Sequence, residues 1–277
     1  TTMAQICADS LGVAIDQITV FHGNTDFLPF GGGTNASRGT VMGGNAVYLA
    51  AQEVKRKVLT IAGSYLGVAP SDLELRDGQV HGKGAETEKP LLSLEDVVPL
   101  AAPTSRFNPL EPGLDATAYF KSDQMTYTYG AHVAHVAVDP ETGKVEVLRY
   151  VAVQDVGRCI NPLLLHGQIV GGVAQGIGAT LLEDLVYSEN GQLLTTTFMD
   201  YLLPTSTVVP PIEAIILEEA PSPLNPLGVK GGGEETSLAT GATLSNAVAN
   251  ALTSFGVKVT ELPLSHNRVR EWIRRRK

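Results

Sequence analysis

Residues 130–139 read GAHVAHVAVD and residues 144–154 read KVEVLRYVAVQ. Both runs are rich in valine, a β-branched residue that is enriched in strands. The four residues between them, PETG, are typical of a turn, so the two runs predict a β-hairpin of two long strands. His132 and His135 are three positions apart on a strand and therefore face opposite sides. We expect one in the core and the other at the surface, and no shared metal.

Helix and strand signals mix on both sides of this hairpin. Apolar spacing predicts helices at 1–11, 36–66, 93–100, 162–184 and 236–255. Short strands are predicted at 17–22, 212–218 and 257–260, and further hairpins at 72–81 and around 189–191. Because the order lacks a regular β-α-β alternation, the sequence predicts an α+β fold of mixed sheets with packed helices. The Pro-rich stretch 101–115 suggests two subdomains, 1–112 and 113–277.

Composition argues against several classes of protein. The 277 residues are 43% hydrophobic and 18% charged, which is typical of a packed globular protein. The net charge of −9 argues against nucleic-acid binding. Cys7 and Cys159 form no CxxC pair, so neither a zinc ribbon nor an iron–sulfur cluster is expected, and a reducing, cytoplasmic compartment is favoured. No apolar run has membrane-spanning length. The basic C-terminal tail, from Arg268 to Lys277, is interpreted as a solvated helix end.

Three loop-to-helix junctions carry the chemistry. They are residues 30–38 (FGGGTNASR), residues 154–162 (QDVGRCINP) with the glycine-rich stretch that follows, and residues 228–237 (GVKGGGEETS). Each places glycines or small polar residues before a helix N-terminus, where unpaired N–H groups and the helix dipole favour an anion. Any one alone is more often a turn or a helix cap than a cofactor loop.

Neither common nucleotide motif fits these junctions. Residues 171–178 (GGVAQGIG) lack the GxGxxG order after a strand, and Lys230 is not followed by Ser or Thr as in a Walker loop. An unrelated nucleotide-binding module, with the acidic pair Glu234 and Glu235 holding magnesium, remains an alternative. It predicts Mg-dependent nucleotide binding.

Taken in order, the segments resemble the C-terminal part of the molybdopterin-binding large subunit of the xanthine dehydrogenase, aldehyde oxidase and carbon monoxide dehydrogenase family. The resemblance covers essentially the whole chain. It rests most on AHVAHVAVDPETGKVEVLRYVAVQDVGRCINP, GQIVGGVAQGIGATLLED and NPLGVKGGGEETSLATGATLSNAV. It implies a molybdenum–molybdopterin cofactor, often the cytosine dinucleotide form in bacterial members, with iron–sulfur clusters and FAD on partner chains. No protein side chain is expected to ligate the metal directly.

The resemblance also implies roles for individual residues. The subdomain 1–112 would bind cofactor, and 113–277 would add the catalytic glutamate loop. Glu234 matches the family's catalytic base. The matching cofactor-binding positions are Gly33, Thr34, Asn35, Ser37, Arg38, Asp155, Gly157, Asn161, Gln168, Lys230, Gly231, Gly232 and Gly233.

A glutamate beside the metal makes chemical sense. A high-valent metal acidifies bound water, and a nearby carboxylate can remove the remaining proton. The resemblance implies that a metal-bound oxygen then attacks an aldehyde, an N-heterocycle or a similar small substrate. Two departures stand out. Glu235 adds a second carboxylate that could take the role of base, and Val156 stands where many relatives have cysteine.

The family's upstream GQG-type cofactor loop has no counterpart in this sequence. We therefore expect an enzyme portion that is inactive alone and needs the N-terminal half of the large subunit or a companion chain, an iron–sulfur subunit and an FAD subunit. The alternative is a non-catalytic assembly or interaction module that keeps the fold without the metal.

Overall fold

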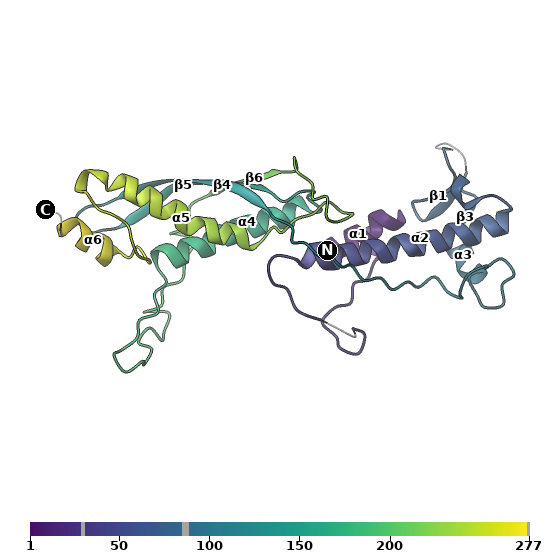
Figure 1. The fold of residues 1–277 in the computed structure, drawn as a ribbon, viewed down its shortest axis with the longest axis horizontal. Helices are drawn as coiled ribbons and strands as arrows, with labels where there is room; N and C mark the ends of the chain where they lie inside the picture. Colours follow the sequence, from purple (N-terminus) through teal and green to yellow (C-terminus); the bar gives the residue numbers. More distant parts are fainter. Residues whose placement is uncertain (29–30, 85–88, 276–277) are drawn as a thin grey trace. The chain divides into compact units, whose positions relative to one another are not determined.

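The computed structural model describes residues 1–28, 31–84 and 89–275. Phe30 of the first junction and the terminal Arg276 and Lys277 lie outside these ranges. Two compact units form: unit 1 comprises Thr1–Met125 with Pro223–Val229, and unit 2 comprises Thr126–Ser222 with Lys230–Lys277 (Figure 1). The expected division at 112/113 concerned cofactor-binding subdomains, which compactness does not test, and it stays a prediction.

Two helices dominate unit 1. Helix α1 (Thr2–Leu11) ends at Gly12, and α2 (Asn45–Leu66) ends at Gly67, both glycines in the left-handed conformation that closes a helix. The predicted long helix therefore ends where expected. Its start differs, because the glycine-rich residues Thr40–Gly44 form a π-helical turn, η2, ahead of α2.

A small antiparallel sheet completes unit 1. Its strands β1 (Leu73–Arg76), β2 (Gln79–Gly82) and β3 (Leu92–Ser93) pair in the order β1-β2-β3. Asp77 and Gly78 both have positive φ, as a tight two-residue hairpin turn requires, so this predicted hairpin is confirmed. Helix α3 (Leu94–Leu100) follows, and the hydroxyl of Ser93 accepts the Asp96 N–H as the expected cap.

Two predicted strands are wrong. Residues 18–22 form no strand and follow a short 3₁₀ turn, η1 (Ile15–Gln17). Phe21 is 76% exposed there, and none of the described strands pairs with this run. Residues 257–260 also lack strand structure, after the short 3₁₀ turn η4 (Thr253–Phe255). Apolar character alone did not distinguish these segments from paired strands.

Unit 2 is built on a three-stranded sheet ordered β4-β5-β6. The predicted hairpin is confirmed as antiparallel β4 (Tyr129–Val138) and β5 (Val145–Asp155). The predicted strand at 212–218 is β6 (Ile212–Leu217), and it runs parallel to β5. The sheet is therefore mixed and the fold is α+β. As expected, His132 faces the half-buried side of β4 and His135 the exposed side.

A β-bulge resets the pleat of β5. His135 pairs with Arg149 whereas Val136 pairs with Val147, so Leu148 has no partner across the ladder. Buried positions consequently change from Val145 and Val147 to Tyr150, Ala152 and Gln154. Without this extra residue, Arg149 would turn toward the core.

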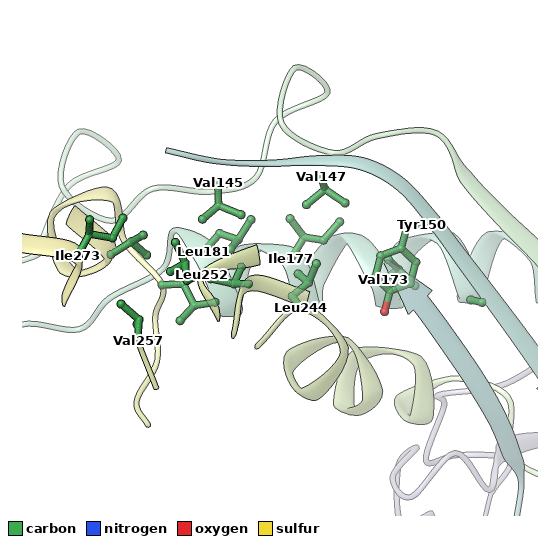
Figure 2. Packing of buried hydrophobic residues seen from close by; sticks show 14 of the residues in the cluster. Val145, Val147, Tyr150, Val173, Ile177, Leu181, Leu244, Leu252, Val257 and Ile273 are labelled. Atoms are coloured by element: carbon green, nitrogen blue, oxygen red, sulfur yellow. The ribbon is translucent and has the colours of Figure 1, made fainter. Parts of the chain in front are cut away.

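Helices α4 (Pro162–Leu181) and α5 (Glu234–Ala251) cover the buried face of this sheet (Figure 1). Both were predicted, although α5 begins two residues earlier and ends four residues earlier than expected. The short helix α6 (His266–Arg274) adds Val269 and Ile273 to the same core. Figure 2 shows Ile273 among the packed side chains. No helix in the described ranges is long and apolar enough to cross a membrane. Around 189–191, only a single bridge, Tyr187 to Leu193, represents the predicted hairpin.

Glycines on α4 bring α5 close. A Cβ at Gly172 would overlap the hydroxyl of Thr236, and a Cβ at Gly176 would lie 2.5 Å from the Cβ of Thr240. The sequence pattern GGVAQG therefore serves helix packing at these two positions. Thr236 and Thr240 are completely buried as a result.

Candidate functional site

The predicted site residues of unit 2 gather where the parallel strands β5 and β6 end. Asp155 and Leu217 are paired at their last positions. Carboxyl ends of parallel strands commonly carry ligand sites, because the loops that follow diverge there and leave a crevice. The loop after β5 leads into α4, and residues 230–233 lead into α5.

Asp155 is the centre of this region. Its side chain is 1% exposed and accepts three hydrogen bonds: the Gly157 N–H at 2.9 Å, the Ala220 N–H at 3.2 Å and the Lys230 ammonium at 3.1 Å. Burial opposes ionisation of this carboxyl, but the hydrogen bonds from Gly157 and Lys230 and the charge of Lys230 outweigh it, so its pKa lies below the ordinary value. Asp155 therefore stays ionised and joins three loop segments.

Lys230 is also held in place by several contacts. Its side chain is 7% exposed, and its ammonium lies 4.4 Å from the centre of the Tyr129 ring, a cation–π contact. Its backbone N–H donates to the Val156 carbonyl at 2.8 Å. Lys230 and Asp155 thus hold the second and third junctions together.

The start of α4 is locally capped. The side-chain oxygen of Asn161 accepts the Leu164 N–H at 2.9 Å, and Pro162 occupies the first helical turn. Gly157 is buried with φ of 66°, a left-handed conformation that favours glycine. Gln168 is exposed on the first turns of α4. Asn161 and Gly157 shape the loop, whereas Gln168 offers its amide outward.

The glycine run before α5 is tightly enclosed on one side. Gly231 is buried, and a Cβ at Gly232 would lie 2.8 Å from a methyl carbon of Leu165 and 3.4 Å from one of Val156. No larger residue fits at Gly232 without displacing these side chains. Val156, the departure noted in the sequence, forms part of this wall. Gly233 is the residue immediately before α5.

The two adjacent carboxylates at the start of α5 differ in environment. Glu234 is exposed. Glu235 is half-buried, and among the described residues no hydrogen-bond partner reaches its buried Oε1. Burial raises the pKa of Glu235, the backbone N–H groups of Glu235 and Gly233 oppose the rise, and the charge of Glu234 adds to it. The two groups do not point to one shared magnesium site.

The first junction belongs to unit 1. The predicted residues Gly33, Thr34, Asn35 and Arg38 are exposed, and Ser37 is half-buried. Ala36 and Ser37 have φ near 50°, which is unusual for residues with a Cβ. The loop thus presents hydroxyl, amide and guanidinium donors on a locally strained backbone.

Sequence reasoning missed three residues that support these loops. Tyr129 contacts Lys230 and carried no sequence signal. Asn45 and Asn225 form a buried amide pair in unit 1, with Asn45 Nδ2 donating to Asn225 Oδ1 at 3.2 Å. Asn45 also accepts the Leu227 N–H, and Asn225 accepts the Val229 N–H. Asn225 lies in the quoted motif NPLGVKG, where its position before the glycine run could have indicated it.

A family model for the molybdopterin cofactor-binding domain matches residues 1–210. The chain belongs to this family. The match includes the first two junctions, and the relatives below also align with the third.

Two curated proteins are similar to almost the whole chain. Subunit gamma of the 6-hydroxypseudooxynicotine dehydrogenase complex of Paenarthrobacter nicotinovorans is 38% identical over 270 residues, 97% of this chain and 34% of that protein. The carbon monoxide dehydrogenase large chain of Afipia carboxidovorans is 35% identical over 273 residues, 98% of this chain and 33% of that protein. The chain thus spans about a third of the length of these relatives.

Solved structures of related proteins have a similar fold over the whole chain. Quinoline 2-oxidoreductase from Pseudomonas putida 86 is 38% identical with a TM-score of 0.92, over 100% of this chain and 35% of that one. A Cu,Mo-containing CO dehydrogenase is 33% identical with a TM-score of 0.91, over 100% of this chain and 34% of that one. The fold is therefore that of the molybdenum-binding domain of these oxidoreductases.

The residues present fit a molybdopterin cofactor. Among the described residues, no group of three or more His, Cys, Asp and Glu side chains is placed to hold a metal ion. Gly233 lies immediately before α5, where the unpaired N–H groups of a helix N-terminus suit an anionic group. Exposed donors such as Arg38 suit the phosphate of a pterin or its nucleotide tail.

Proposed function

We propose that this chain forms part of the cofactor site of a molybdenum hydroxylase that oxidises an aldehyde, an N-heterocycle or a similar small substrate. The observation that carries the proposal is Glu234. It is the first residue of α5, it is exposed, and it directly follows a glycine run that a buried ion pair anchors. The cofactor, when bound, supplies the two-electron oxidation of substrate.

Glu234 is proposed as the proton acceptor. One of its carboxylate oxygens removes a proton from the water that provides the product's new oxygen. Helix α5 begins at Glu234, so its carboxylate directly follows the glycine run. Glu235 is turned partly into the protein and is not assigned this role.

The other predicted residues bind and orient. Thr34, Asn35 and Arg38, which are exposed, and the half-buried Ser37 are proposed to bind the pterin and the phosphate of a cytosine dinucleotide tail. Gln168 is proposed to donate an amide hydrogen bond to the cofactor. Asp155 and Lys230 bind each other, so their contribution is to fix the loops that carry Gly157 and Gly231–Gly233.

N-heterocycles head the list of candidate substrates. Two relatives at 38% identity carry such substrates in their names, nicotine 6-hydroxylase and quinoline 2-oxidoreductase. Because the relatives are about three times longer, the proposal includes the remaining part of a large subunit, an iron–sulfur subunit and an FAD subunit as partners.

The test uses the chain assembled with its genomic neighbours. Molybdenum content and substrate-dependent dye reduction are measured for wild type, Glu234→Gln and Glu235→Gln, with nicotine, quinoline, aldehydes, purines and carbon monoxide offered in turn. We expect stoichiometric molybdenum in all three proteins, activity lost in Glu234→Gln and activity kept in Glu235→Gln.

Each other outcome is informative. Loss of activity only in Glu235→Gln would move the base by one residue. A correctly assembled complex without molybdenum would refute the catalytic proposal and favour an assembly module.

A further inference from the structure

A chain of buried and half-buried polar side chains crosses the core of unit 2 and connects the sheet with the start of α5. Gln154 Nε2 lies 2.8 Å from His132 Nε2, and His132 Nδ1 lies 2.8 Å from the hydroxyl of Tyr150. That hydroxyl donates to Thr240 Oγ1 at 3.1 Å. Tyr150 is fully buried and is the largest such side chain in the core (Figure 2).

The two hydroxyls in this polar chain both donate toward α5. The ring nitrogens of His132 contact Gln154 and Tyr150, and burial lowers the pKa of His132. Tyr150 donates to Thr240, and Thr240 donates to the Thr236 carbonyl at 2.6 Å.

This polar chain ends at the first turn of α5. Thr236 is the third residue of that helix, and its hydroxyl donates to the Gly233 carbonyl at 3.0 Å. Hydrogen bonds therefore run from the sheet to the residue immediately before Glu234. Glycines are conformationally permissive, so bonds to their carbonyls restrict a segment that is otherwise free to change its backbone angles.

Packing alone does not require the hydroxyls. Phenylalanine would fill nearly the volume of Tyr150, and valine is close in shape to Thr240. Thr236 and Thr240 both face glycines of α4 and are completely buried. Their hydroxyls therefore depend on partners inside the protein.

We infer that Tyr150 and Thr240 are positioning residues that set the first turn of α5, and with it Glu234. The inference rests on the proposed function, in which Glu234 accepts the proton. Neither residue contacts a reacting atom. Because catalysis depends steeply on geometry, a small displacement of Glu234 slows turnover while substrate and cofactor binding are retained.

The experiment uses the assembled complex with four variants. Tyr150→Phe and Thr240→Val each remove one hydroxyl, and Thr240→Ser keeps the hydroxyl while losing a methyl group. Val173→Ala opens the same core without touching the polar chain and controls for destabilisation. Molybdenum content, kcat and KM are measured, together with amide hydrogen exchange of a peptide covering residues 231–240.

We expect Tyr150→Phe and Thr240→Val to lower kcat by about ten- to a hundredfold with unchanged KM and molybdenum. Exchange in residues 231–240 should accelerate in both. Thr240→Ser should restore wild-type kcat and exchange, and Val173→Ala should leave kcat unchanged.

The inference is overturned if amide exchange of residues 231–240 stays at the wild-type rate in Tyr150→Phe and Thr240→Val. It is also overturned if Val173→Ala loses as much kcat as these two variants. If Tyr150→Phe does not assemble, the difference in kcat and amide exchange between Thr240→Val and Thr240→Ser tests the inference. A fully active Glu234→Gln refutes the proposed function instead, and the exchange data still decide whether the polar chain positions α5.

Discussion

Replacing Asp155 with asparagine tests the most buried electrostatic contact of the site. The substitution keeps the shape of the side chain but removes the charge opposite Lys230, which is itself 7% exposed. The new amide group also faces backbone N–H groups at Gly157 and Ala220 that need acceptors. A buried ammonium without a counter-charge and an unpaired donor both destabilise the folded state.

We expect Asp155→Asn to lower the free energy of unfolding by about 3–5 kcal/mol, the usual cost of breaking a buried ion pair from one side. At about 2–4 °C per kcal/mol for a domain of roughly this size, Tm should fall by roughly 6–20 °C. Lys230→Met should cost less than Asp155→Asn, because the carboxylate keeps two N–H donors. The double variant should cost less than the sum of the two.

The matched control lies on the same sheet. Arg149 and Glu213 pair at 2.7 Å, but their side chains are 70% and 50% exposed. Glu213→Gln should therefore change stability by no more than about 1 kcal/mol. Urea unfolding monitored by circular dichroism gives the free energy of unfolding of Asp155→Asn and of Glu213→Gln.

The pH dependence provides a second check. The folded pKa of Asp155 lies below its unfolded value, so its stabilising effect is fully present above the unfolded pKa and is lost as pH falls through the folded pKa. The stability gap between wild type and Asp155→Asn should shrink over that range. The reasoning would be refuted if Asp155→Asn lowered the free energy of unfolding as little as Glu213→Gln does. It would also be refuted if the stability difference between wild type and Asp155→Asn increased as the pH falls.

Two further predictions concern α4 and the start of α5. Glu235 has a raised folded pKa, so its effect is fully favourable below the unfolded pKa and is lost as pH rises through the folded value; Glu235→Gln should match wild type in acid and exceed its stability near pH 7. Unfolding curves at several pH values check this, and a wild type that gains on the variant with rising pH would contradict it. Gly176→Ala should cost about 1–3 kcal/mol because the new methyl meets Thr240, whereas Gly171→Ala, with nothing within 4 Å, should be neutral or stabilising by up to about 1 kcal/mol. Thermal unfolding of the two alanine variants tests the difference, and equal Tm values would refute it.

Local sequence features predicted most of the elements. The β4–β5 hairpin followed from two valine-rich runs around PETG, and the ends of α1 and α2 followed from glycines that close a helix. Such features work because turns and caps depend on backbone preferences of a few neighbouring residues. The failed strands at 17–22 and 257–260 had the composition of strands but no partner strand, and a partner is a property of the fold.

The candidate site was predicted by position more than by role. The family resemblance assigned Asp155, Lys230 and Glu234 to one cofactor site, and the loops at the ends of β5 and before α5 bring the first two into contact. Their mutual ion pair was not foreseen, and Tyr129 carried no signal at all. A motif records which residues recur together, but it does not say which of them contact one another.

By itself, the sequence determined most of the helices, the main hairpin, the glycine junctions and the acidic pair at positions 234 and 235. Only the tertiary structure decided that β6 runs parallel to β5, that a bulge at Leu148 turns Tyr150 inward, and that Glu235 rather than Glu234 is partly buried. The reason is physical: backbone preferences act over a few residues, whereas strand register, burial and the pairing of charges depend on segments distant in the chain.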